Sequence, residues 1–264
     1  MAAKYERIAN DLRRRIRSHE LAPGQQVPAQ TALAEQYRVS LPTIQQALGV
    51  LQAEGLIDAV HGIGTYVRAP RRRVRRTTDR YQWEKARALD PLGERSQTGS
   101  IEYDTGLTMQ DLDFHAEYRT ESADPDLAKA FGVEPDTNLL HRIYRGAVRS
   151  EGVAVSLIDS YLVYDVAAAN PDLLDAANEP WPGGTHHQLR TIGVEIDRIV
   201  DEITARPPQG DEIELLGIGS GVAVLVLRKT SIDIGGQVVE ISDVIMPGDR
   251  TVMTYQTQLD RWQA

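Results

Sequence analysis

The chain has 264 residues, of which 41% are hydrophobic and 25% charged, values typical of a folded globular protein with room for two domains. It contains no cysteine, which excludes disulfides, thiolate metal sites and cysteine nucleophiles. No apolar run approaches the roughly 18 residues of a membrane span, so we expect a cytoplasmic protein with no membrane partner.

Charge is distributed unevenly along the chain. Residues 1–80 carry 14 Lys and Arg against 7 Asp and Glu, whereas the remaining residues carry 15 against 31. A basic N-terminal part followed by an acidic body predicts that only the N-terminal part binds a polyanion.

The first 40 residues predict two helices separated by a turn. The first helix has an apolar stripe at helical spacing, formed by Tyr5, Ile8, Ala9, Leu12 and Ile16. Pro23 and Gly24 then break the chain, and a second short helix is expected around Leu33 and Tyr37. Arg38 and Val39 are expected to form a tight turn after it.

A third helix is expected after Ser40, whose hydroxyl is suited to cap its N-terminus. Its inward face consists of Ile44, Ala47, Leu48 and Leu51, and its outward face of Leu41, Pro42, Thr43, Gln45 and Gln46. Strands are expected over residues 56–60 and 65–68, with a glycine-rich tip between them. This order of elements is typical of a winged helix-turn-helix, which places one helix in the DNA major groove.

The stretch from Tyr5 to Val67 resembles the DNA-binding domain of the GntR family of bacterial transcription regulators. The matching residues are Ala34-Glu35-Gln36-Tyr37, Val39-Ser40, Pro42-Thr43, Ala47-Leu48, Leu51, Glu54-Gly55-Leu56-Ile57, Gly62 and Gly64-Thr65-Tyr66-Val67. The resemblance implies a winged helix-turn-helix domain over residues 1–68 that binds a double-stranded DNA operator. A plain three-helix bundle with a hairpin is the alternative, but it gives no reason for glycines at the hairpin tip.

Many members of this family place three arginines against the bases, and these positions hold Thr31, Leu41 and Gln45 here. Arginine reads guanine, whereas glutamine pairs with adenine and an apolar side chain contacts the thymine methyl group. We therefore expect Leu41, Gln45 and Gln46 to read adenine and thymine, unless the two glutamines are simply solvated. The other candidate DNA contacts are Arg38, Ser40, Pro42, Thr43, His61, Gly62, Arg68, Arg71, Arg72 and Arg73. The basic run that starts at Arg71 is either a solvated linker or a set of phosphate contacts.

Residues 69–111 are expected to form a basic linker, and residues 112–264 a second domain of mixed helices and strands. Strands are expected over 112–120, 139–149, 153–163, 195–205, 222–234, 238–246 and 251–259. Helices are expected over 125–131, 166–177, 186–192 and 211–216. The expected fold class is therefore α+β.

Residues 113–255 resemble the UTRA domain, the effector-binding domain of the HutC branch of the GntR family. The matching segments are Glu117-Tyr118-Arg119-Thr120, Asp159-Ser160-Tyr161-Leu162, Leu215-Leu216-Gly217, Val224-Leu225-Val226-Leu227-Arg228-Lys229-Thr230-Ser231, Gly236, Val239-Glu240 and Ser242. The resemblance implies an antiparallel sheet flanked by helices, related in fold to chorismate lyase, that binds a small molecule and forms a dimer interface. Because one DNA-binding domain is small, we expect a homodimer on an inverted repeat.

Sugar-phosphate-sensing members of this branch carry an arginine pair at positions that hold Gly146 and Val148 here. A glutamate that they use falls on Ile158, and another is kept as Glu240. Without the two arginines, a sugar phosphate is disfavoured as the effector. The candidate effector-binding residues are Arg145, Asp159, Thr185, His187, Glu240 and Met246, although each also suits a structural role.

No metal or cofactor is expected. His186 and His187 are adjacent, so on a helix they point apart and cannot chelate one ion. No nucleophile-base set is visible, and we expect no enzymatic activity, with a chorismate-lyase-like enzyme as the remote alternative. The expected function is a DNA-binding regulator, most often a repressor, whose operator binding responds to a small-molecule effector. An effector-independent DNA-binding repressor is the other alternative.

Overall fold

The computed structural model describes residues 3–60 and 62–259. Backbone contacts divide the chain into two units. Unit 1 consists of Met1–Arg72 together with Pro207–Ala223, and unit 2 of Arg73–Arg206 together with Val224–Ala264. A segment from the C-terminal half of the sequence is thus part of the N-terminal unit.

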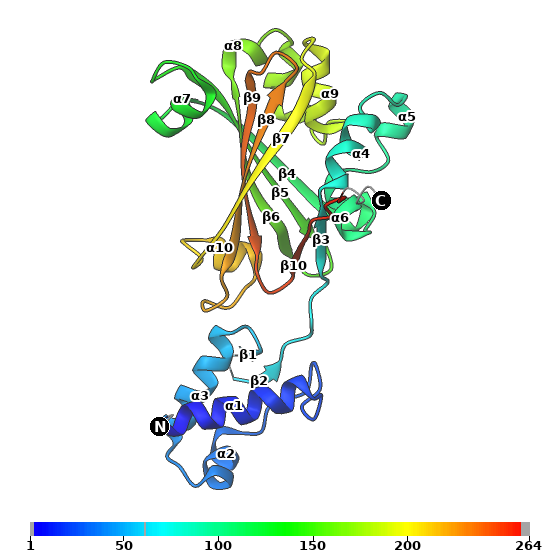
Figure 1. Cartoon of the computed structure of the whole chain (residues 1–264). Coiled ribbons are helices and arrows are strands. Elements are labelled where there is room, and N and C mark those ends of the chain that lie inside the picture. The colour runs from blue at the N-terminus through cyan, green and yellow to red at the C-terminus, as the bar shows by residue number, and fades with distance from the viewer. Residues whose placement is uncertain (1–2, 61, 260–264) are drawn as a thin grey trace, which may run out of the picture. The chain divides into compact units, whose positions relative to one another are not determined.

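The N-terminal segment of unit 1 forms the helices α1 (Lys4–Arg17), α2 (Gln30–Tyr37) and α3 (Leu41–Ala53), followed by the strands β1 (Ile57–Val60) and β2 (Gly64–Val67) (Figure 1). The two strands pair antiparallel, with Ile57 opposite Val67. The buried core consists of Ile8, Ala9, Leu12, Leu21, Val27, Leu33, Ile44, Ala47, Leu48, Leu51, Ile57 and Val67. The expected winged helix-turn-helix is confirmed. The inserted segment adds one short helix, α10 (Glu212–Leu216).

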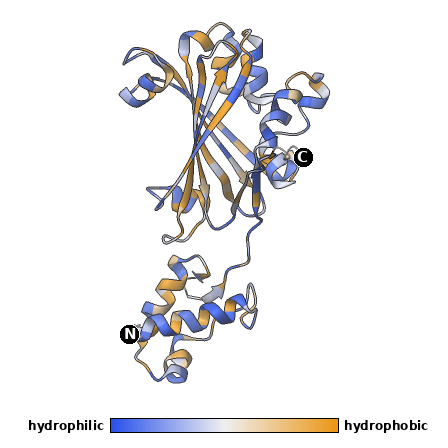
Figure 2. Ribbon diagram, in the orientation of Figure 1, coloured by the Kyte–Doolittle hydropathy of each residue, from blue (hydrophilic) through white to orange (hydrophobic). Residues whose placement is uncertain are grey.

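Unit 2 is built on one six-stranded antiparallel sheet with the order β4-β5-β6-β9-β8-β7. Its strands are β4 (Leu112–Ser122), β5 (Asn138–Val148), β6 (Val153–Val163), β7 (Ile196–Arg206), β8 (Val224–Asp233) and β9 (Val238–Pro247). Hydrophobic residues recur along these strands (Figure 2) and bury one or both faces of the central ones. The expected α+β fold with an antiparallel sheet is confirmed.

The helix α7 (Pro125–Phe131) follows the sequence signals closely. The Asp124 side chain accepts a hydrogen bond from Leu127 N at 2.7 Å, and Gly132 ends the helix at φ +70°. The single helix expected over residues 166–177 is wrong. The chain instead forms α8 (Tyr164–Ala167) and two 3-10 turns, η2 (Pro171–Leu174) and η3 (Ala176–Asn178). Proline has no N–H to continue a helix and restricts the residue before it, so the helix stops before Pro171.

Residues 69–111, expected to be a connecting segment, carry regular structure. They form β3 (Val74–Thr77), α4 (Asp79–Arg87), α5 (Leu92–Arg95), α6 (Ser100–Thr105) and η1 (Met109–Asp111). The strand β3 pairs in parallel with β10 (Thr251–Thr254). The helices α4, α5, α6 and α9 (Gly184–Thr191) lie along one side of the sheet (Figure 1). Periodicity missed α4 because its buried residues are Arg80 and Arg87 rather than apolar side chains.

Candidate nucleic-acid interface and effector cavity

The first two turns of α3 present an exposed surface in unit 1. Leu41 is 42% exposed, although it is a large apolar side chain, and Gln45 and Gln46 are exposed as well. Ile44 and Leu48, on the opposite face, are buried in the core, as the sequence predicts. The N-terminal residues of such a helix are those that reach base edges in helix-turn-helix proteins. The side chains expected to read bases are therefore free to do so.

Ser40 occupies the N-cap position of α3, but its hydroxyl makes no hydrogen bond to a helix N–H. It lies 3.0 Å from the hydroxyl oxygen of Thr43 instead. The expected side-chain cap is wrong because the Thr43 hydroxyl, three residues on, provides a competing partner. Pro42 lies in the first turn of the helix, where the missing N–H of proline needs no partner.

Thr31 and Arg38 lie at opposite ends of α2, and both are exposed. Arg38 adopts the left-handed conformation at φ +53° and makes the turn into α3. It has no ion pair or side-chain hydrogen bond within residues 3–60 and 62–259, so its guanidinium is available to a phosphate.

We expect Arg38→Asn to weaken DNA binding about equally on all sequences, because a phosphate contact carries no base information. Asparagine tolerates the left-handed backbone at this position, so the fold should be kept. The slope of log affinity against log salt should fall by about one unit. Fluorescence anisotropy over a salt series measures this slope, with Lys129→Gln in α7 as the control. An unchanged slope would show that Arg38 makes no phosphate contact.

The β1–β2 hairpin forms the wing. Gly62 is exposed at φ +73°, and His61 lies outside the described residues. Gly64 has φ +149°, and a Cβ at this position would collide with Gln26 Nε2. Gln26 Nε2 in turn donates to Ile63 O at 3.3 Å, which ties the tip of the wing to the rest of unit 1.

The arginines after the wing are partly engaged within unit 1. Arg68 donates from Nε and Nη2 to the two Asp58 carboxylate oxygens at 3.0 and 2.8 Å, and from Nη1 to Gly217 O at 3.0 Å. Arg71 Nη1 donates to Leu216 O at 3.0 Å. Both would have to give up these bonds to contact phosphate. Arg72 and Arg73 are exposed.

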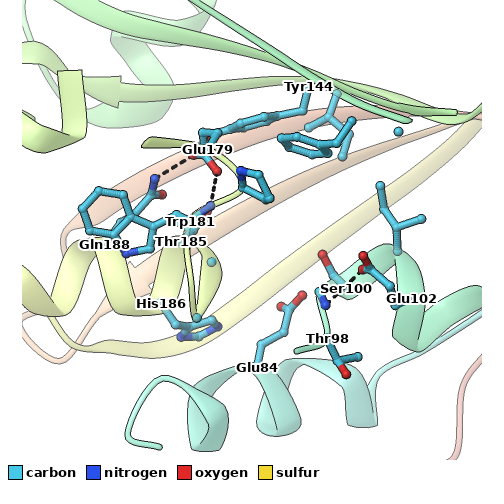
Figure 3. Close-up of a pocket in the computed structure, with 18 of the residues that line it drawn as sticks. Glu84, Thr98, Ser100, Glu102, Tyr144, Glu179, Trp181, Thr185, His186 and Gln188 are labelled. Atoms are coloured by element: carbon cyan, nitrogen blue, oxygen red, sulfur yellow. Dashed lines mark hydrogen bonds between the residues drawn. The ribbon is translucent and has the colours of Figure 1, made fainter. Parts of the chain in front are cut away.

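Unit 2 holds a cavity of about 200 Å³. One wall consists of the strands β5, β6 and β9, a second of α9 and the loop that precedes it, and a third of α4 and the segment from α5 to α6 (Figure 3). Glu84 and Glu102 approach the cavity from the helical side, opposite Tyr144 and Glu179. The lining mixes aromatic and charged side chains, which suits a small polar ligand.

Two hydrogen-bonded clusters, one buried and one partly buried, contribute to the lining of this cavity. In the first, Glu240 accepts from Arg142 Nη2 at 2.9 Å and from Lys229 Nζ at 2.8 Å, and Arg142 and Glu240 are each 1% exposed. Burial alone would raise the pKa of Glu240, but Lys229 and Arg142 outweigh it and hold that pKa far below its usual range.

In the second cluster, Glu179 Oε1 accepts hydrogen bonds from Tyr118, Tyr144 and Gln188, and its Oε2 accepts from Trp181 N at 2.6 Å. Burial raises the pKa of Tyr118 to about 12, so this phenol stays a donor. Gln188 Oε1 also accepts from Arg142 Nη1 at 2.7 Å, which joins the two clusters.

The sequence matches two family models. Residues 4–67 match the bacterial regulatory proteins of the gntR family, and residues 115–251, about half of the chain, match the UTRA domain. The chain belongs to the GntR family. It is a transcription regulator with a UTRA effector-binding domain, rather than an enzyme.

Full-length relatives agree with this assignment. The chain is 24% identical over 260 residues to the HTH-type transcriptional repressor NagR of Bacillus subtilis, covering 97% of this chain and 95% of the relative. It is 26% identical over 251 residues to the histidine utilization repressor of Pseudomonas putida, covering 94% and 90%. A solved GntR-family transcriptional regulator superposes with a TM-score of 0.62 at 27% identity, and the match covers 98% of each chain.

Within this GntR-family chain, two of the six candidate effector residues line the cavity. These are Thr185, whose hydroxyl lies 3.3 Å from Glu240 Oε1, and Glu240 itself. Gly146 and Ile158, which hold the positions of charged residues in sugar-phosphate-sensing members, also line it. Val148 does not, since it packs in a separate apolar cluster.

The other four candidates lie away from the cavity lining. Arg145 is exposed on β5, and Asp159 accepts a hydrogen bond at 2.8 Å from His141. His187 Nδ1 accepts from Trp181 Nε1 at 2.9 Å, and Met246 packs with Leu227 and Val244. Arg145 is therefore solvent-exposed, and Asp159, His187 and Met246 make contacts within the fold. Sequence position alone did not distinguish the residues that line the cavity from those that support the fold.

Several lining residues escaped the sequence analysis, among them Arg87, Arg95, Tyr144, Glu179 and Trp181. A lone acid in a loop, or an arginine at the end of a short polar helix, gives no periodic apolar signal. The Glu179-Pro180-Trp181-Pro182-Gly183-Gly184 stretch was the available hint, because its prolines and glycines indicate a shaped loop.

In the part of the chain that the structure describes, no three His, Asp or Glu side chains gather closely enough to hold an ion. None of the described helices combines the length and the apolar character that a bilayer crossing requires.

His141 predicts a pH-dependent contribution to the stability of unit 2. Its ring nitrogens lie 3.0 Å from Glu121 Oε2 and 2.8 Å from Asp159 Oδ1. Burial lowers the pKa of His141, but the hydrogen bond that its ring donates to Asp159 and the charge of Glu121 outweigh burial, so the pKa lies above its usual value.

A raised folded-state pKa stabilises the fold at pH values below the unfolded-state pKa of about 6.5, and this contribution is lost as the pH rises through the folded-state pKa. We expect His141→Gln to cost at most about 1 kcal/mol, because both carboxylates are more than one-third exposed. Urea unfolding at pH 6 and pH 9 should give a smaller difference between the two proteins at pH 9. A difference that grows with pH would contradict this assignment.

Proposed function

We propose that this regulator is a repressor that binds an inverted-repeat operator as a homodimer and changes its DNA affinity when a small molecule occupies the cavity of unit 2. The observation that carries the proposal is the exposed N-terminal half of α3, with Leu41 and Gln45 unburied in a chain that belongs to the GntR family. Two full-length relatives are named as repressors, which supports the direction of regulation.

In this proposal α3 enters the major groove. Leu41 contacts a thymine methyl group, and Gln45 and Gln46 pair with adenines. Thr31, Arg38, Ser40 and Thr43 contact the backbone around them, and the wing at Gly62 approaches the minor groove. Pro42 packs at the start of α3 and places these side chains.

The homodimer follows from the size of the interface. A single winged helix buries too little surface for tight specific binding, so two copies are needed on half-sites at a fixed separation. The small molecule then acts by favouring a dimer whose DNA-binding units no longer match that separation. A coupling of about 1–3 kcal/mol is enough to change operator occupancy.

Fluorescence anisotropy of the full chain on DNA from immediately upstream of its own gene tests this function. Scrambled DNA of equal length is the control, and a duplex with one half-site deleted tests the dimer. We expect at least about a hundredfold preference for the operator, a steep salt slope, and a loss of at least about tenfold for the single half-site. If the upstream DNA, and every other promoter tested, bound no more tightly than scrambled DNA of equal length, the proposal would be contradicted.

A further inference from the structure

We propose that the effector carries an anionic group, a carboxylate or a phosphate, which binds in the cavity between Arg87, Arg95 and the N-terminus of α9. This inference rests on the proposed function, because it names the chemical class of the molecule that the cavity of unit 2 takes. The sequence disfavours a sugar phosphate because Gly146 and Val148 replace the two phosphate-binding arginines on β5. We propose that arginines from other elements bind the anionic group instead.

The charges around the cavity do not balance. Its basic lining residues are Arg76, Arg80, Arg87, Arg95 and Lys229. Arg80 is paired with Glu84 and Asp104, and Lys229 is paired with Glu240. No carboxylate lies within ion-pair distance of the other three in the described residues.

The acidic lining residues, by contrast, are all engaged. Glu84 pairs with Arg80, and Glu240 pairs with Arg142 and Lys229. Glu102 accepts from Gly99 N at 3.0 Å, and Glu179 has four donors. The positive charge left over in the lining therefore has no counterion in the described part of the chain, and an anionic ligand would supply one.

Arg87 is the most constrained of the three unpaired arginines. It is 8% exposed, and its Nη1 donates to the carbonyl oxygens of Arg95, at 2.7 Å, and Thr98. Its guanidinium carbon lies 4.8 Å from the Trp83 ring, which fixes its plane. Its Nε is buried with no hydrogen-bond partner, a costly arrangement that natural proteins seldom keep without a reason.

Arg95 repeats this pattern on the neighbouring element. Its Nη1 donates to Asp90 O at 3.2 Å, and its Nε is also buried and unpartnered. Burial lowers the pKa of Arg87, so a bound anion would stabilise a charge that the protein holds at a cost.

The third component of the proposed anion site is the N-terminus of α9, an eight-residue helix whose N-cap residue makes no side-chain hydrogen bond. Gly183 is its N-cap residue and Gly184 its first residue, and both have the left-handed conformation, at φ +94° and +61°. A Cβ on Gly183 would lie 3.3 Å from Arg95 Cδ, and one on Gly184 would lie 3.7 Å from Arg87 Nη2. The backbone at the start of α9 thus lies close to both arginines. Gly184 N already donates to Trp181 O at 2.8 Å, so the N–H groups offered to an anion are those of the residues that follow in the first turn.

The arginines come from a part of the chain that neither family model covers. Residues 68–114 lie between the two matched segments, and α4 and α5 carry Arg87 and Arg95. On the facing strand, a side chain at Gly146 would collide with Ile101 of α6. The helix α6 therefore occupies the place that a β5 arginine takes in sugar-phosphate-sensing members. The neighbouring helices α4 and α5 provide positive charge through Arg87 and Arg95 instead.

Thermal unfolding of the full chain, followed by tryptophan fluorescence, tests this inference. Unit 1 contains no tryptophan, so the signal reports on unit 2. The probes are inorganic phosphate and pyruvate, with potassium chloride at equal ionic strength as the reference. We expect one probe to raise the midpoint with a saturable dose response, and the probe that does so distinguishes a phosphorylated effector from a carboxylic acid.

Arg87→Gln and Arg95→Gln should each raise the half-saturating concentration at least tenfold, whereas Arg119→Gln, an exposed arginine on β4, should leave it unchanged. If Arg87→Gln does not fold, Arg95→Gln decides. The inference is overturned if neither probe acts beyond chloride, or if both variants respond like the wild type. Operator binding is measured on the same preparations. If operator binding persists while only neutral sugars stabilise unit 2, the protein is still a DNA-binding regulator but its effector is not an anion. If operator binding is absent, the proposed function itself is wrong.

Discussion

Replacing Gln45 with alanine is expected to weaken operator binding by roughly 5- to 150-fold for each half-site, because a bidentate glutamine–adenine pair contributes about 1–3 kcal/mol of discrimination. Gln45 is exposed in the second turn of α3 and is not needed for the core, so the fold should be unaffected. The measurement is anisotropy on the operator and on operators with single base-pair changes. The preference for A·T should disappear at one position per half-site and remain at the others.

The salt slope separates this effect from a loss of phosphate contact. Gln45→Ala should leave it unchanged, unlike Arg38→Asn, because no counterion is released at a base contact. Gln82→Ala, an exposed glutamine on α4 in unit 2, is the matched control. If Gln45→Ala weakened binding to every sequence alike, or not at all, Gln45 would be a solvated residue and α3 would read its operator through other side chains.

Replacing Glu240 with alanine is expected to destabilise unit 2 by about 3–5 kcal/mol, since it leaves the buried Arg142 and the partly buried Lys229 without their shared counterion. Urea unfolding followed by tryptophan fluorescence measures the loss in unit 2. Glu202→Ala, which removes an exposed carboxylate from β7, should change stability by less than about 0.5 kcal/mol.

A double-mutant cycle sharpens this prediction. Arg142→Met combined with Glu240→Met should cost much less than the sum of the two single changes, because the pair is removed together. Additive losses would mean that the two residues stabilise the sheet independently.

The contribution of Glu240 to the stability of unit 2 depends on pH with the opposite sign to the contribution of His141. The pKa of Glu240 is lowered, so its contribution is present above the usual glutamate pKa and is lost only as the pH falls through the lower folded-state pKa. Wild-type unit 2 should therefore lose this contribution only in strong acid.

Much of unit 1 and of the sheet could be predicted from the sequence. The buried face of α3 was predicted from the spacing of Ile44, Leu48 and Leu51, and α7 from Asp124 and Gly132. These features depend on residues within one or two turns of each other, so local patterns carry them. The prediction of a single helix over residues 166–177 was wrong because it rested on apolar spacing alone. Pro171 is a local signal that ends a helix whatever the spacing around it.

The effector cavity was beyond local prediction. Thr185 and Glu240 were expected there and line it, but Arg145 and Asp159 were expected as well and lie outside it. Alternation along a strand indicates which residues share a face. It does not indicate which part of that face a distant helix covers.

By itself, the sequence determined that the chain carries a winged helix-turn-helix and an antiparallel α+β domain, because amphipathic spacing, caps and turn glycines act over a few residues. Only the tertiary structure decided what surrounds the cavity. Arg87 and Arg95 meet Gly183 and Gly184 across about ninety residues of sequence, and only after that approach is the Nε of each arginine buried with no counterion in the described part of the chain. Burial changes the free energy of a charge far more than sequence neighbours do, and burial is a property of the folded chain alone.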